Sequence, residues 1–72
     1  MKYIVIELQT QADGTVMNLV SSYDTLNEAE SKFHQILMYA ATSSLAVHAA
    51  VILTSEGYMM KNECYKHIVT TE

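Results

Sequence analysis

The residue types best suited to chemistry lie in two short segments of the second half of this 72-residue chain. His48 lies within a largely apolar run. Glu63, Tyr65 and His67 alternate along a later run, so they share one face if that run is a strand. If the two runs pair as antiparallel strands, His48 lies opposite Tyr65, with Glu63 and His67 within reach. Imidazole, phenol and carboxylate groups on one face could transfer protons or hold a metal ion.

Other features of the sequence argue against catalysis. Cys64 and His67 are three residues apart on a predicted strand, so they point to opposite faces and cannot form a dyad. Gly14 and Gly57 are the only glycines and both fit turns, which leaves no phosphate-binding loop. We therefore expect no enzymatic activity and no cofactor. A small-ligand or metal-binding protein, using the His/Tyr side chains at a subunit interface, is the alternative.

The charge balance restricts the possible partners. Eight acidic residues face four lysines, and the chain has no arginine, so the net charge is −4. Arginine is the usual residue for bidentate contacts with phosphate and guanine. Sequence-specific nucleic-acid binding is therefore not expected. Tyr3, Tyr58 and Tyr65 could stack on unpaired bases, so weak binding of single strands is a second alternative.

Composition predicts one domain, residues 1–72, in the cytoplasm. A single cysteine, Cys64, excludes an internal disulfide and a cysteine-type zinc site, and a free thiol fits a reducing compartment. Charge appears too early, at Glu7, for a signal peptide. No apolar run approaches the roughly 20 residues that a membrane span needs. A chain this short has a thin core, so oligomerisation is the stabiliser that remains.

One helix is predicted within the stretch 24–44. Thr25 and Glu28 have the spacing of a capping box, in which the threonine hydroxyl accepts a hydrogen bond from the Glu28 amide. An apolar stripe recurs at helical spacing and consists of Leu26, Ala29, Phe33, Ile36, Leu37 and Ala40. Met38 and Tyr39 fall outside this stripe, and we expect them to be partly buried.

Four strands are predicted at 3–10, 15–23, 45–54 and 58–69, because these runs are rich in β-branched and aromatic residues. The order along the chain is thus β-β-α-β-β. An α+β fold follows, with two layers and one helix on a four-stranded antiparallel sheet. Strand order 2-1-3-4 gives antiparallel neighbours and short connections. Order 1-2-3-4 with a right-handed crossover is the alternative.

Two glycine-containing turns set the expected register. A two-residue type I′ turn at Asp13-Gly14 would pair Leu8 with Leu19 and Ile4 with Tyr23. In the second hairpin, a two-residue turn at Glu56-Gly57 would pair Leu53 with Met60 and Ala49 with Cys64. In this register, apolar residues lie opposite apolar residues.

One helix covers only one face of a sheet, and we predict that the uncovered face is an interface. In the expected register, the helix covers the face of Ile4, Ile6 and Leu8. The uncovered face then holds the candidate interface or ligand residues, which are Tyr3, Val5, Ala46, His48, Ala50, Ile52, Glu63, Tyr65 and His67. Exposed apolar surfaces of this kind mark interaction sites. We therefore expect a homodimer or larger homo-oligomer that can also bind another protein.

The overall pattern resembles a group of short uncharacterised proteins from gut Firmicutes and their phages. The likeness rests on segments 1–8, 12–15, 27–32, 47–51 and 56–58. It includes no functional motif, so it assigns no activity and no site residue. The resemblance implies a phage or prophage accessory role, such as acting on a host or defence protein.

Overall fold

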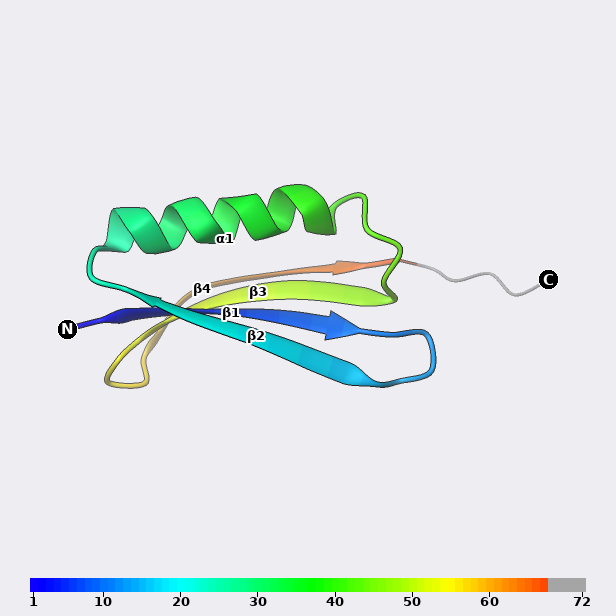
Figure 1. Ribbon diagram of the computed structural model, residues 1–72, viewed down its shortest axis with the longest axis horizontal. Coiled ribbons are helices and arrows are strands. Elements are labelled where there is room, and N and C mark those ends of the chain that lie inside the picture. The colour runs from blue at the N-terminus through cyan, green and yellow to red at the C-terminus, as the bar shows by residue number, and fades with distance from the viewer. Residues whose placement is uncertain (68–72) are drawn as a thin grey trace.

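The computed structural model describes residues 1–67, which form one helix on a four-stranded antiparallel sheet (Figure 1). The strands are β1 (Tyr3–Thr10), β2 (Val16–Tyr23), β3 (Val47–Thr54) and β4 (Met59–Lys66), and the helix is α1 (Leu26–Ala40). The strand order is β2-β1-β3-β4. The predicted α+β fold and its preferred strand order are confirmed. The end of the last predicted strand, residues 68–69, lies outside the described residues.

The helix begins where the capping residues predict. The hydroxyl of Thr25 accepts a hydrogen bond from the Glu28 amide at 3.2 Å and donates one to the Glu28 carboxylate at 3.0 Å. Four residues of the predicted stripe are buried, namely Ala29, Phe33, Ile36 and Ala40. Met38 and Tyr39 are exposed, so the expected partial burial of these two residues is wrong.

The first hairpin has a loop of three residues, not two. The Gln11 amide donates to the Thr15 carbonyl at 2.8 Å, and the Gly14 amide donates to the Gln11 carbonyl at 3.0 Å. Within this loop only Gly14 has a positive φ, 92°, whereas a type I′ turn needs positive φ at both central residues. The predicted type I′ turn is therefore wrong, because Asp13 keeps an ordinary negative φ.

The longer loop shifts the register of β1 and β2 by one residue. Leu8 pairs with Asn18 and Ile4 pairs with Ser22, so both predicted pairs are wrong. A shift of one residue exchanges the faces of a strand. Val16 and Val20 therefore lie on the face of Ile4, not on the face of Val5.

The second hairpin also has a three-residue loop, in which Gly57 has a φ of 91°. Leu53 pairs with Met59, not with Met60 as predicted. An irregularity between Ile52 and Leu53 then restores the expected register, and the predicted pair of Ala49 with Cys64 is confirmed.

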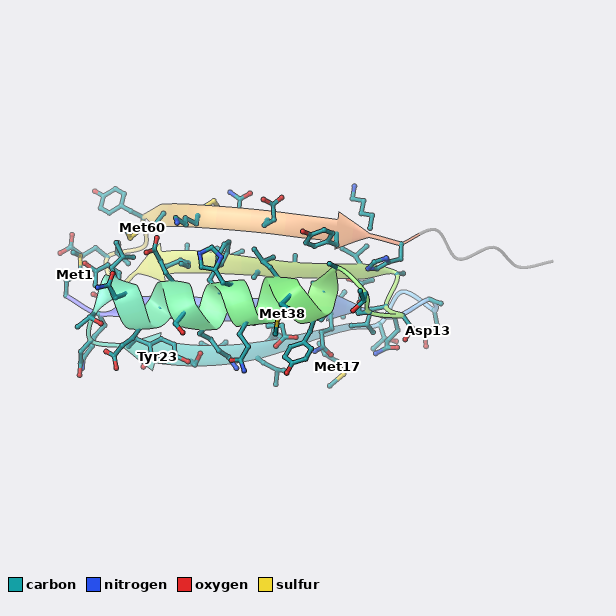
Figure 2. The ribbon with its side chains drawn as sticks, turned by 90° about the horizontal axis from the view of Figure 1, so that it is seen from above. Met1, Asp13, Met17, Tyr23, Met38 and Met60 are labelled. Atoms are coloured by element: carbon teal, nitrogen blue, oxygen red, sulfur yellow. The ribbon has the colours of Figure 1, made fainter. Side chains whose placement is uncertain are left out.

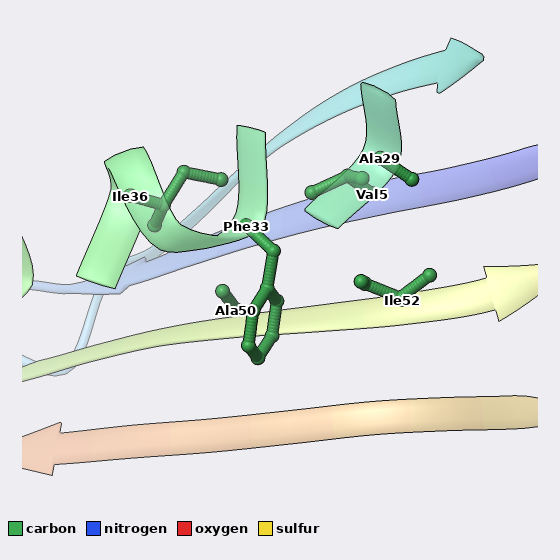
Figure 3. Close-up of a cluster of buried hydrophobic side chains, with 6 residues drawn as sticks. All are labelled: Val5, Ala29, Phe33, Ile36, Ala50 and Ile52. Atoms are coloured by element: carbon green, nitrogen blue, oxygen red, sulfur yellow. The ribbon is translucent and has the colours of Figure 1, made fainter. Parts of the chain in front are cut away.

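The helix packs on the face of the sheet opposite to the predicted one (Figure 3). Phe33 of α1 lies over Ala50 of β3, and Val5 and Ile52 complete the floor of the core. Both faces of β3 are apolar, so alternation alone does not say which face the helix covers. The handedness of the connection does, since the crossover from β2 through α1 to β3 is right-handed (Figures 1 and 2).

Candidate functional site

Helix α1 covers one face of the sheet and leaves the other uncovered (Figure 1), and we call this uncovered face the open face. The register places on it the side chains of Ile4, Ile6, Leu8, Val16, Val20, Val47, Ala49, Val51, Leu53 and Cys64. No other element of residues 1–67 lies against this face. An uncovered apolar surface of this extent is typical of an interaction site.

The open face is apolar at its centre and mixed at its edges. The central strands β1 and β3 contribute Ile6 and Val51, which pair with each other. Polar side chains lie on the outer strands and at the strand ends, namely Thr10, Asn18, Ser22, Asn62 and Lys66. An apolar centre within a polar rim is the common anatomy of a protein–protein interface.

The size of the open face fits a specific contact. Four strands of eight residues span roughly 26 Å by 19 Å, or about 500 Å² in projection, at the usual rise and strand spacing. The accessible area of such a corrugated surface exceeds its projection. It therefore approaches the ~800 Å² per partner of a standard interface.

The sequence-predicted His48 lies under the helix, in a hydrogen-bonded cluster with two residues of β1. Its Nε2 is 2.6 Å from Oε2 of Glu7, and Nε2 of the Gln9 side chain donates a hydrogen bond to the same oxygen at 2.8 Å. The side chains of His48 and Glu7 are 5% and 15% exposed. Because an ionised carboxylate only accepts hydrogen bonds, Nε2 of His48 carries the donated hydrogen. This cluster ties β1 to β3 beneath α1.

The environment of Glu7 favours its ionised form. Burial raises the pKa of this carboxyl, but hydrogen bonds from Gln9 and His48, together with the charges of His48 and Lys32, outweigh it. The pKa of Glu7 therefore lies below its ordinary value of 4.5. Sequence reasoning missed the contact between Glu7 and His48. The signal for it was present: Val5, Glu7 and Gln9 share one face of the first strand, and strand order 2-1-3-4 makes the first and third strands neighbours.

The other predicted residues of this group lie on β4 and just beyond its end. Tyr65 pairs with His48 as predicted, but it is exposed on the edge strand β4, as is Glu63. The ring Nε2 of His67 is 2.8 Å from the carbonyl oxygen of Ala40 at the end of α1. Within residues 1–67, no three His, Cys, Asp or Glu side chains gather closely enough to hold a metal ion. The predicted pairing of His48 with Tyr65 is thus confirmed, while the predicted uncovered position of His48 is wrong.

The predicted set of interface residues does not occupy the open face. Val5, Ala50 and Ile52 belong to the core beneath the helix. The sheet register places Tyr3, His48, Glu63 and Tyr65 on that same side. Ala46 lies there too, because its carbonyl accepts from the amide of His67, whose ring reaches the helix end. The prediction of the uncovered face was wrong because it exchanged the two faces of the sheet.

A shallow groove of about 260 Å³ separates α1 from β2. Its lining residues are Glu7, Leu19, Val20, Ser21, Lys32 and Ile36. The groove arises because α1 lies over β1 and β3 and leaves β2 largely uncovered (Figure 2). Its one carboxylate, that of Glu7, is already hydrogen-bonded to His48 and Gln9.

Comparison of the chain with protein-family models, with curated proteins and with solved structures found no match. The resemblance described from the sequence stays a prediction. Across residues 1–67, no helix combines the length and the apolar character that crossing a bilayer requires. The open face is the candidate site that the geometry of the described residues supports best.

Proposed function

We propose that this protein is a small interaction module that self-associates, sheet to sheet, through its open face. The observation that carries this proposal is the row of apolar side chains on β1 and β3, the two central strands, on the face opposite α1. Two such faces related by a two-fold axis would meet about 10 Å apart, with their side chains interdigitated. Each copy would then form one outer half of a four-layer assembly.

The thin core supports this proposal. The buried cluster consists of six side chains, Val5, Ala29, Phe33, Ile36, Ala50 and Ile52, and two of them are alanines. Domains of this size bury a smaller share of their surface than larger domains do, and they commonly gain stability from association. Covering the open face would give β1 and β3 a second apolar layer.

The chemistry of the open face supports binding and not catalysis. Its central positions on β1 and β3 are aliphatic, and within the four strands the titratable side chains on this face, those of Cys64 and Lys66, lie on the edge strand β4. Aliphatic side chains supply neither a nucleophile nor an acid–base group. The surface therefore suits a protein partner better than a reacting substrate.

A charge at the centre of the open face tests this proposal. Val51→Lys places an ammonium group opposite Ile6, where it would be buried without a partner in a sheet-to-sheet assembly. We expect this variant to fold but to have at most half of the wild-type mass in sedimentation equilibrium. Gln35→Lys, at an exposed position on α1, adds the same charge on the other side of the molecule and should retain the wild-type mass.

Equal masses for wild type, Val51→Lys and Gln35→Lys would contradict association through the open face. Circular dichroism of each variant confirms that a change of mass reflects lost association and not lost folding. If Gln35→Lys alone reduced the mass, the helix side would be the contact surface.

A further inference from the structure

Strand β2 exposes an unpaired row of backbone groups along its outer edge. It is an edge strand in the order β2-β1-β3-β4. The amide of Gln11 bonds to the carbonyl of Thr15, and antiparallel hydrogen bonds then alternate along the hairpin. Residues 17, 19, 21 and 23 therefore direct their backbone groups to β1. Residues 16, 18, 20 and 22 direct theirs outward, where nothing in the described chain pairs with them.

The side chains of β2 do not protect this edge. The strand has no charged residue, no proline and no bulge. Apolar side chains project on both faces of it, with Val16 57%, Met17 49%, Leu19 53% and Val20 62% exposed. Long apolar edges of this kind recruit a further strand, and proteins that avoid such pairing place lysine, proline or a bulge there.

The other edge of the same sheet has those protective features. Strand β4 carries Lys61, Glu63 and Lys66, and its pairing with β3 is irregular next to Leu53. Lys61 also forms an ion pair with Glu30 of α1 at 2.5 Å. A copy of β4 placed antiparallel around Glu63 would bring two carboxylates together. The protection of one edge and not of the other points to β2 as the edge used for binding.

We infer that β2 binds the β2 strand of a second copy of this chain, antiparallel around a two-fold axis at Asn18. In this register, Val16 lies opposite Val20 of the second copy, and Met17 lies opposite Leu19. Apolar side chains thus meet apolar side chains on both faces, and no like charges meet. The outward backbone groups of residues 16, 18 and 20 pair with those of the second copy, and two four-stranded sheets become one continuous sheet.

This inference concerns a different surface from the proposed function. The edge of β2 and the open face can each form a two-fold contact, and using both would give a tetramer. Val51→Lys removes only the sheet-to-sheet contact, so an edge-paired dimer should remain. Failure of one proposal is therefore distinguishable from failure of the other.

Cross-linking at the proposed axis tests the inference directly. Asn18→Cys is made together with Cys64→Ser, which removes the exposed native thiol, and with Val51→Lys, which removes the sheet-to-sheet contact. Paired residues at the axis of a hydrogen-bonded antiparallel pair have Cα atoms ~5.5 Å apart, within disulfide range. Mild oxidation should give a covalent dimer. Ser22→Cys in the same background lies on the same strand but far from the axis, and should stay monomeric on a denaturing gel.

A matched pair of proline variants supplies the second test. Asn18 and Asn62 lie on the two edge strands, and both side chains are on the open-face side. By the alternation of hydrogen bonds, the backbone N–H group of each residue points outward, away from the sheet. Because proline removes that donor, Asn18→Pro in the Val51→Lys background should turn the dimer into a monomer, whereas Asn62→Pro should not. No cross-link at position 18, or equal masses for the two proline variants, would overturn the inference.

Discussion

Phe33→Ala is expected to destabilise this protein by about 3–5 kcal/mol, the usual cost of truncating a buried phenylalanine. Phe33 is 4% exposed and lies between α1 and Ala50 in a six-residue core. A chain of this length has a free energy of unfolding of about 4–11 kcal/mol, at roughly 0.05–0.15 kcal/mol per residue. The variant should therefore lose a large part of its stability, as measured by urea unfolding at a fixed protein concentration.

Met38→Ala is the control for the Phe33 variant. Met38 lies on the same helix but is 63% exposed, so its truncation should change the free energy of unfolding by less than about 0.5 kcal/mol. If Phe33→Ala cost no more than Met38→Ala, the helix would not pack on the face that carries Val5 and Ala50.

Glu7→Ala is expected to cost about 3 kcal/mol. Leaving a buried hydrogen-bonding group without its partner costs about 1–3 kcal/mol, and the upper value applies because two donors lose a charged acceptor. The substitution leaves His48 and Gln9 without their shared acceptor under the helix. Glu63→Ala, which removes an exposed carboxylate from β4 on the same face, should have little effect in the same urea measurement.

The milder Glu7→Gln variant gives the pair a pH signature. The pKa of Glu7 is lower in the folded protein than its ordinary value of 4.5, so the ionised carboxylate stabilises the fold fully above that value. This stabilisation is lost as the pH falls through the lowered pKa. The stability difference between wild type and Glu7→Gln should therefore shrink on acidification. A difference that stayed constant down to acid pH would show that the Glu7 charge does not stabilise the fold.

Local sequence signals predicted the elements and their order. The Thr25–Glu28 cap, the apolar stripe of α1 and the four runs rich in β-branched and aromatic residues each act within a few residues, so each can be read without knowledge of the rest of the fold. The strand order followed from short connections and antiparallel pairing.

The face covered by the helix could not be read from the same local signals. Strand β3 is apolar on both sides, and the prediction placed the row with Val47 and Val51 against the helix. In the structure the row with Ala50 and Ile52 faces the helix, and the Phe33 ring packs over Ala50. The crossover handedness depends on the whole β2-α1-β3 unit, which no single strand encodes.

The hairpin loops were the second source of error. A type I′ turn and a three-residue loop both use Asp-Gly or Glu-Gly, and they differ by one residue in the register that they impose. Because one residue exchanges the faces of a strand, the slip in the first hairpin exchanged the sides of Val16 and Val20 relative to β1. The position of His48 does not depend on these loops, and only the choice of helix face placed it on the uncovered side.

The central claim is that the open face binds a second copy of the chain. Native mass spectrometry of the wild-type protein, over a range of micromolar concentrations, measures the subunit number directly. The account predicts an assembly of two or more copies that is weakened by Val51→Lys and not by Gln35→Lys. A monomer at every concentration would contradict it, because the open face would then remain exposed to water.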